Sequence, residues 1–175
     1  MNKITSLCAL LVITSMPTMA HECNEPKYQP LVDKAAVMCA EYYGKELTEN
    51  YQIINLPDYK EYKNAIEKEH LHYLKGEPNE NNLDYLTKKT QACSHLTSPV
   101  ILVNKNASEF FSKASYRELN PKEYLTIVTH ELIHKYQWAA ANGDPKNLPS
   151  RQALEKEATE LSKQLVKKAK KDKLI

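Results

Sequence analysis

Two histidines and a glutamate lie close together in the segment His130-Glu131-Leu132-Ile133-His134. Residues four apart lie one turn above each other on an α-helix, so both imidazoles could bind a single metal ion. Glu131 follows the first histidine directly and could take a proton from water held on that metal. The pattern H-E-x-x-H therefore predicts a hydrolytic zinc site on a helix, with Glu131 as its catalytic residue.

The residues around this motif favour a buried helix. Asn120 and Glu123 can form an N-terminal capping box, with Pro121 in the first turn. Asn142-Gly143 supplies the stop signal. The apolar residues between these signals face nearly all directions around the axis: Leu125, Ile127, Val128, Leu132, Ile133 and Trp138. Imidazoles and a carboxylate buried in such a helix need a partner, and a metal ion would supply one.

A third metal ligand is expected on a second helix, which Ser150 can cap. The short loop over residues 144–149 makes the two helices antiparallel neighbours, so a carboxylate early in the second helix faces the end of the first. Glu155, Glu157 and Glu160 all lie in this stretch. These glutamates could equally form a solvated helix face paired with lysines.

The combination resembles the zincin metallopeptidases of the gluzincin type, in which H-E-x-x-H is followed by a metal-binding glutamate on the next helix. The resemblance covers about residues 98–162. It implies that His130 and His134 bind Zn²⁺ together with Glu155, because Glu155 is followed by Ala158 as in the E-x-x-A pattern of several zincins. Glu157 is the alternative third ligand.

Other members of the zincin group match less well. Thermolysin-like enzymes carry an aspartate, which orients a metal-bound histidine, where this chain has Thr159. The residues after His134, at positions 135–137, include no glycine or third histidine at the metzincin spacing. The chain therefore departs from both patterns around the metal ligands.

The resemblance implies an α+β fold, a helix-rich zincin-like domain with a small sheet packed behind the H-E-x-x-H helix. It also implies a metallopeptidase that hydrolyses peptide bonds of a peptide or protein substrate, with Glu131 activating the water. The alternative is a zincin-fold binding or inhibitor-type protein without turnover. The substrate and the oligomeric state leave no trace in the sequence.

The first 20 residues are typical of a secretory signal peptide. Lys3 precedes a mostly apolar stretch over residues 4–16, and Ala20 ends a small-residue cleavage site. Residues 21–175 then form a single domain in the periplasm or outside the cell. No later segment is apolar enough to predict a transmembrane helix.

Charge and cysteine content complete the prediction. The formal net charge is only +2, which gives no steering toward nucleic acid. Cleavage would leave Cys23, Cys39 and Cys93 in an oxidising compartment. Three thiols there predict one disulfide and one unpaired cysteine, with the pairing left open.

Hydrophobic periodicity and turn residues predict the remaining elements. Helices are expected over residues 29–43, from Asp58 to about Gly76, and over 83–93. Strands are expected over 51–56 and 100–103, the second of them near the cleft but at an unspecified place in the sheet.

Three further histidines could bind metal. On a helix, His70 and His72 diverge by about 200° and cannot share an ion. His21 would become the mature N-terminus and could chelate copper through its amine and ring if a second histidine lay nearby.

Overall fold

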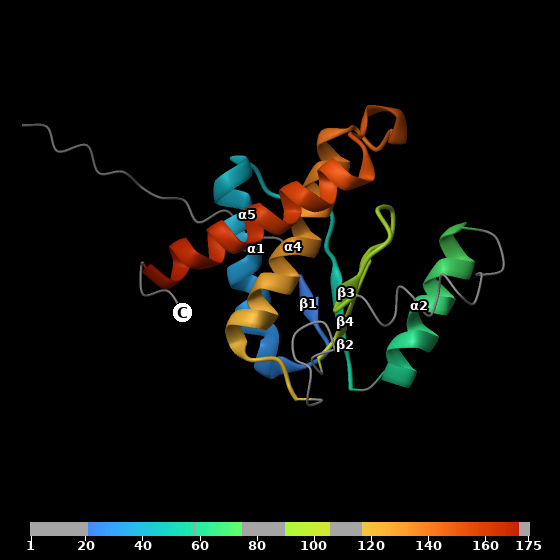
Figure 1. The fold of residues 1–175 in the computed structure, drawn as a ribbon, viewed down its shortest axis with the longest axis vertical. Coiled ribbons are helices and arrows are strands. Elements are labelled where there is room, and N and C mark those ends of the chain that lie inside the picture. Colours follow the sequence, from blue (N-terminus) through green and yellow to red (C-terminus); the bar gives the residue numbers. More distant parts are fainter. Residues whose placement is uncertain (1–20, 58, 75–89, 106–116, 172–175) are drawn as a thin grey trace, which may run out of the picture.

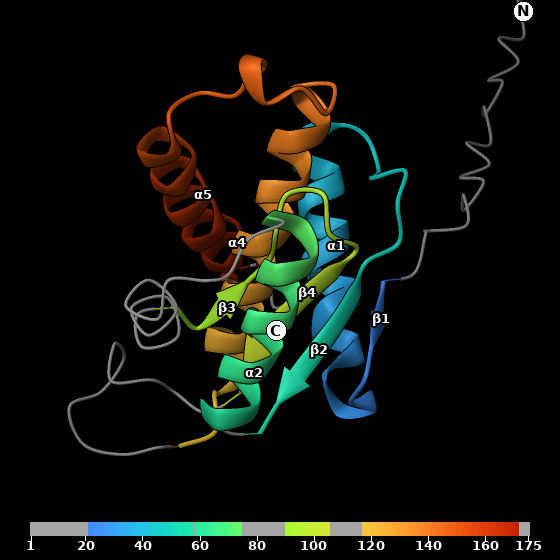
Figure 2. The ribbon, with the colours of Figure 1, turned by 90° about the vertical axis from the view of Figure 1, so that its right-hand side faces the viewer.

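Helices lie on both faces of a small sheet (Figures 1 and 2). The computed structural model describes residues 21–57, 59–74, 90–105 and 117–171. The elements along the chain are β1 (Glu22–Cys23), the 3-10 turn η1 (Pro26–Tyr28), α1 (Gln29–Tyr43), β2 (Gln52–Leu56), α2 (Tyr59–Leu74), β3 (Ala92–Cys93), β4 (Val100–Asn104), α4 (Pro121–Ala140), the 3-10 turn η2 (Pro145–Asn147) and α5 (Arg151–Lys171). The predicted α+β class is confirmed.

The sheet has the strand order β1-β2-β4-β3. The first three strands are parallel, with Ile53 opposite Ile101, and the connection from β2 to β4 contains α2. The short strand β3 pairs antiparallel to β4 and forms the edge of the sheet. The strand predicted over residues 100–103 is therefore confirmed, and it lies inside the sheet rather than at its edge.

Both faces of the sheet are covered by helices. Successive side chains of a strand point to opposite faces. Ile101 and Val103 of β4 lie in the larger core with α1, α4 and α5, whereas Leu102 packs against Tyr62 and Ile66 of α2. The sheet thus packs behind the H-E-x-x-H helix, as predicted.

Two pairs of stacked tyrosines connect α4 to η1 and α1. Tyr124 stacks on Tyr28, with ring centroids 4.1 Å apart, and Tyr136 stacks on Tyr43 at 4.4 Å. Offset aromatic pairs of this kind add roughly 1 kcal/mol each beyond the area they bury. They hold α4 near both of its ends and leave the face with the histidines open to α5.

A buried lysine connects α4 to the segment between β3 and β4. Lys135 is only 1% exposed, and its ammonium donates to the carbonyl oxygens of His95 (2.7 Å) and Ser98 (2.8 Å). It also lies 5.0 Å from the centre of the Tyr51 ring. A buried ammonium is tolerated only with such partners.

The turn between α4 and α5 follows the predicted stop signal. Asn142 and Gly143 both have positive φ, 55° and 68°. The Gly143 amide donates to the Trp138 carbonyl at 3.2 Å, and a Cβ at position 143 would lie 3.7 Å from the Trp138 ring. The chain then reverses through η2 into α5, whose Ala158 is fully buried in the core.

The structure corrects two predicted elements. Residues 83–89 lie outside the described residues, but Ala92–Cys93, the end of the helix predicted over 83–93, forms β3. Pairing with β4 outweighs local helix preference there, since Ala92 lies opposite Val103 and Cys93 opposite Leu102. The strand β1 was not predicted, because two residues are too few to show an alternating pattern.

The predicted disulfide is wrong for this structure, since Cys23, Cys39 and Cys93 are not joined to one another within the described residues. Cys23 in β1 and Cys93 in β3 belong to opposite edges of the sheet, about 14 Å apart for three strand spacings, which is too far for a disulfide. Cys39 is buried in α1, where its thiol faces the Thr129 carbonyl at 3.9 Å. Burial raises the pKa of the Cys39 thiol to about 12.

Within the described residues, no helix has the length and apolar character needed to cross a bilayer. The signal peptide predicted over residues 1–20 lies outside the described residues.

Candidate metal centre

The helix that carries the H-E-x-x-H motif begins with the predicted capping box. The Asn120 side chain accepts a hydrogen bond from the Glu123 amide, and the Glu123 carboxylate accepts one from the Asn120 amide, both at 3.0 Å. Pro121 occupies the first turn. Side chains of α4 are buried on several sides, among them Val128, Leu132 and Ile133, so the packed core fixes the direction in which the histidines point.

Three predicted ligands converge on one point. The Nε2 atoms of His130 and His134 lie 3.1 Å apart, and Oε2 of Glu155 lies 3.4 Å from the first and 3.7 Å from the second. In a tetrahedral zinc site, ligand atoms about 2.1 Å from the metal are roughly 3.4 Å from one another. Two imidazoles and one carboxylate are also a common donor set of catalytic zinc sites. The three residues could therefore hold a metal ion.

The other two glutamates of α5 do not join this group. Glu157 instead accepts a hydrogen bond from Nε2 of Gln137 at 3.1 Å. Glu160 is not among the side chains whose ligand atoms lie together. Glu155 is therefore the carboxylate of α5 that lies beside the two imidazoles, whereas Glu157 is hydrogen-bonded to Gln137.

Gln137 orients His134. Its Nε2 donates to the Leu154 carbonyl (3.2 Å) and to Glu157, which both only accept, so its Oε1 must face His134 Nδ1 at 2.7 Å. An amide oxygen accepts, so Nδ1 of His134 carries the hydrogen and Nε2 is free to bind a metal. By resemblance, the residue that orients a histidine ligand was expected at position 159, and Gln137 was not predicted from the sequence. The only sequence signal for Gln137 is its position three residues after His134 on the same helix.

The pKa values reflect the same cluster. Hydrogen bonding to His130 and then to His134 holds the pKa of Glu155 far below its usual range. Burial, the largest single influence on His134, lowers its pKa, but Glu155, Glu131 and Gln137 together outweigh burial and the pKa is raised. Without a metal, the hydrogen bond to Glu155 thus favours the protonated form of His134.

A cavity of about 350 Å³ opens beside these three residues. It lies between α4, α5 and the edge strand β3. Glu131 lines the cavity and is only 7% exposed. A molecule held there would contact Glu131 together with His130, His134 and Glu155. No tyrosine or further histidine is among the described residues that line it.

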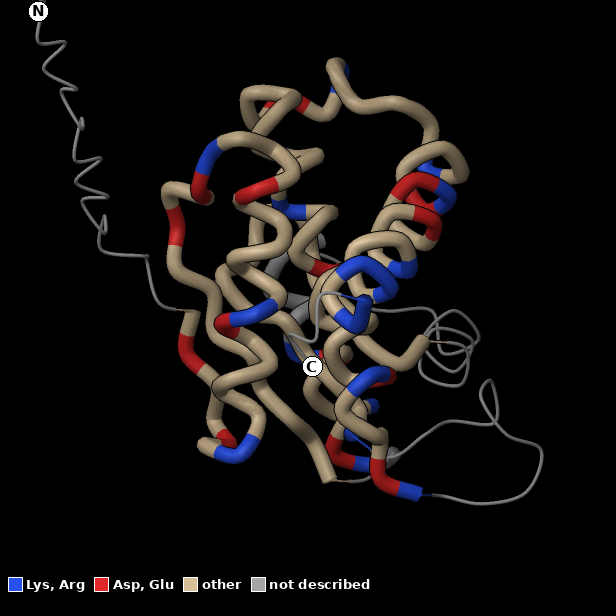
Figure 3. The backbone as a smooth tube through the Cα atoms, turned by 90° about the vertical axis from the view of Figure 1, so that its left-hand side faces the viewer, with Lys and Arg blue, Asp and Glu red and all other residues tan. Residues whose placement is uncertain are grey.

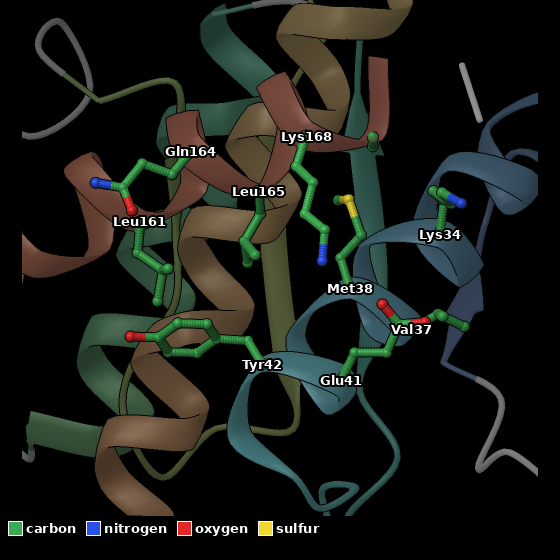
Figure 4. Close-up of a pocket in the computed structure, with 10 residues that line it drawn as sticks. Lys34, Val37, Met38, Glu41, Tyr42, Leu161, Gln164, Leu165 and Lys168 are labelled. Carbon is green, nitrogen blue, oxygen red and sulfur yellow. The ribbon is translucent and has the colours of Figure 1, made fainter. Parts of the chain in front are cut away.

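A second hollow, of about 450 Å³, lies between α1 and α5. Met38 and Tyr42 of α1 face Leu161 and Leu165 of α5 there, with Lys168 extended over the groove (Figure 4). It contains no histidine or cysteine among its described lining residues. We assign it no chemistry.

The remaining histidines do not form a metal site in the described part of the chain. His21 is buried, and its Nδ1 accepts a hydrogen bond from the Tyr51 amide at 3.2 Å. That atom is therefore occupied, and among the described residues His21 belongs to no group of three or more potential metal ligands. The segment with His70 and His72 is helical, as predicted.

Comparison of the chain with protein-family models, with curated proteins and with solved structures gives no match. The function of the centre must therefore be argued from its own geometry.

Proposed function

We propose that this protein is a zinc-dependent metallopeptidase in which His130, His134 and Glu155 hold the metal. The observation that carries the proposal is the convergence of three ligand atoms within 4.8 Å of one another, with Glu131 in the wall of the same cavity. A purely structural cluster does not require Glu131. Glu155 already lies within ion-pair distance of both imidazoles, so a second carboxylate, that of Glu131, would be buried without a structural reason.

The residues divide the chemistry between them. A zinc ion at this centre would polarise the peptide carbonyl and lower the pKa of the attacking water. Glu131 would accept the proton of that water and pass it to the leaving amine. Gln137 would keep the hydrogen of His134 on Nδ1, away from the ligand position.

The edge strand β3 offers a place for an extended substrate. Ala92 and Cys93 pair with β4 on one side and line the cavity on the other. A peptide added to this edge would form main-chain hydrogen bonds and lie across the metal centre. Since residues 1–20 are typical of a signal peptide, we propose that this hydrolysis occurs in the periplasm or outside the cell.

The test combines metal analysis with digestion of a proteome-derived peptide mixture read by mass spectrometry. We expect about one zinc per chain in the wild type after dialysis against metal-free buffer, and none in His134→Ala. Glu131→Gln should keep its zinc and cleave about a thousandfold more slowly, because it lacks only the base.

Two outcomes would contradict the proposal. A folded wild type that takes up no zinc means that the histidines are structural. A zinc-loaded wild type that cleaves no peptide supports instead the alternative of a binding or inhibitor-type protein without turnover.

A further inference from the structure

Two cations flank Glu155 along α5. Arg151 lies four residues before Glu155 and Lys163 eight residues after it, and all three side chains line the cavity. At 1.5 Å per residue, Arg151 is about 6 Å from Glu155 along the helix axis and Lys163 about 12 Å in the other direction. Figure 3 shows that acidic and basic residues are mixed in the first part of this helix, whereas the charged residues after Glu160 are all basic.

The position of Arg151 in the helix does not explain its positive charge. Arg151 is the first residue of α5, where the helix dipole disfavours positive charge. Neither Arg151 nor Lys163 forms an ion pair with any residue that the structure describes. Both side chains are exposed, so their charges are available to a ligand in the cavity.

Polar side chains also belong to the rest of the wall. Five small hydroxyl side chains are among the described lining residues, namely Thr90, Ser94, Thr126, Thr159 and Ser162. The described lining contains no phenylalanine, tyrosine or tryptophan, and Ile127 is its largest aliphatic side chain. With a divalent ion bound, the charged groups around the cavity would be net positive, and a concave site concentrates such a field on its ligand.

We propose that the cavity selects peptides that carry carboxylate side chains near the scissile bond, with Arg151 and Lys163 as specificity-determining residues. The inference rests on the proposed peptidase function and adds its substrate class. A guanidinium binds a carboxylate through two parallel hydrogen bonds, whereas an ammonium acts as a point charge. An extended peptide advances about 3.3 Å per residue, so cations about 6 and 12 Å from Glu155 can reach side chains two to four residues from the bond.

Binding is measured separately from turnover, with the zinc-loaded Glu131→Gln protein. The probes are a pentapeptide of alternating alanine and glutamate, acetylated and amidated, and its glutamine counterpart. We expect the acidic peptide to bind about fivefold more tightly in calorimetry. The preference should disappear in the additional double variant Arg151→Gln, Lys163→Gln, and weaken at high salt because these charges are exposed.

Lys167→Gln is the matched control, since Lys167 is an exposed cation of the same helix outside the described lining of the cavity. It should retain the preference. Equal binding of the two peptides, or a preference that survives the double variant with its zinc in place, would overturn the inference.

Cleavage supplies the second readout. The wild type should cut the peptide mixture preferentially where aspartate or glutamate lies within four residues of the bond, and the double variant should lose this preference while still cutting. Cleavage without acidic preference rejects the inference alone. A binding preference without any cleavage rejects the peptidase proposal and leaves Arg151 and Lys163 as the determinants of an anionic ligand site.

Discussion

At the residue scale, one buried amide decides which nitrogen of His134 faces the metal centre. Gln137 is fixed by the Leu154 carbonyl and by Glu157, so its oxygen can only point toward Nδ1 of His134. Such partners hold the ring orientation of a ligand and increase its basicity. Gln137 thus links His134 to Glu157, the alternative third ligand of the sequence analysis.

We expect Gln137→Leu to weaken zinc binding by about tenfold or more, because Nδ1 of His134 loses its acceptor and the ring is no longer held. Competition with a zinc chelator measures the change. Gln152→Leu, an exposed glutamine of α5, is the control and should bind zinc as the wild type does. Unchanged affinity in Gln137→Leu would mean that the packing of α4 alone orients His134.

His21 makes stability depend on pH. Burial lowers its pKa below 6.5, and the weaker influence of Asp33 opposes the shift. As the pH falls below about 6.5, the unfolded chain binds a proton that the folded protein does not bind, so stability is complete above this pH and is lost below it. Protonation would also remove the acceptor of the Tyr51 amide.

We therefore expect the melting temperature to fall more between pH 7.5 and pH 5.5 in the wild type than in His21→Gln. Glutamine offers an oxygen acceptor but has no proton to take up in this range. All other titrating groups, His134 included, are common to the two proteins. An equal fall in both would show that His21 does not contribute.

At the scale of elements, α4 carries both histidines of the candidate metal centre and also packs at the centre of the fold. Its histidine face is open to α5, while Lys135 on the same helix reaches the carbonyls of the segment that joins β3 to β4. The edge of the cavity is therefore positioned by α4 itself. Loss of this connection should therefore lower the free energy of unfolding.

We expect Lys135→Met to lower the free energy of unfolding by about 2 kcal/mol, because the Ser98 carbonyl loses a buried donor while the methionine only replaces the apolar stem. Chemical denaturation measures it. Lys122→Met, at an exposed position of the same helix, should change stability by less than about 0.5 kcal/mol. A similar small change at position 135 would contradict the role assigned to the buried ammonium.

The sequence predicted the elements whose signals are local. The capping box at Asn120, the stop at Asn142-Gly143 and the spacing of the two histidines all arise within one helix, and each is confirmed in the structure. Glu155 was the preferred carboxylate on the basis of a resemblance, and it is the one that lies beside the imidazoles.

What the sequence did not predict depends on contacts between distant segments. The strand β3 exists because Ala92–Cys93 pairs with β4, and Gln137 acts through a carbonyl and a carboxylate of the next helix. A disulfide was predicted from the oxidising compartment alone, since the sequence does not give the positions of the three cysteines in the fold. Their places on separate elements are set by the strand order, which no local pattern contains.

At the scale of the whole molecule, the candidate metal centre joins α4 and α5, the last two helices of the described chain. A ligand that binds only the folded state stabilises it by about 4 kcal/mol at a concentration a thousandfold above its dissociation constant. For a domain of this size, that corresponds to a rise in melting temperature of roughly 10 °C. Removal of zinc should therefore lower the stability of the entire fold, not of the site alone.

We expect a chelator to lower the melting temperature of the zinc-loaded wild type by about this amount, as measured by calorimetry. Glu155→Gln should reduce the shift strongly, because a ligand is lost, whereas Glu157→Gln should retain most of it. The reverse result, with the larger loss in Glu157→Gln, would identify Glu157 as the metal ligand.

The turn after α4 has an optical consequence. Trp138, the single tryptophan of the chain, lies four residues after His134 and packs against Gly143. One helical turn, about 6 Å along the axis, separates it from a metal ligand. The protein's entire tryptophan emission thus originates beside the metal centre, so the chain carries its own fluorescent reporter for the events that occur there.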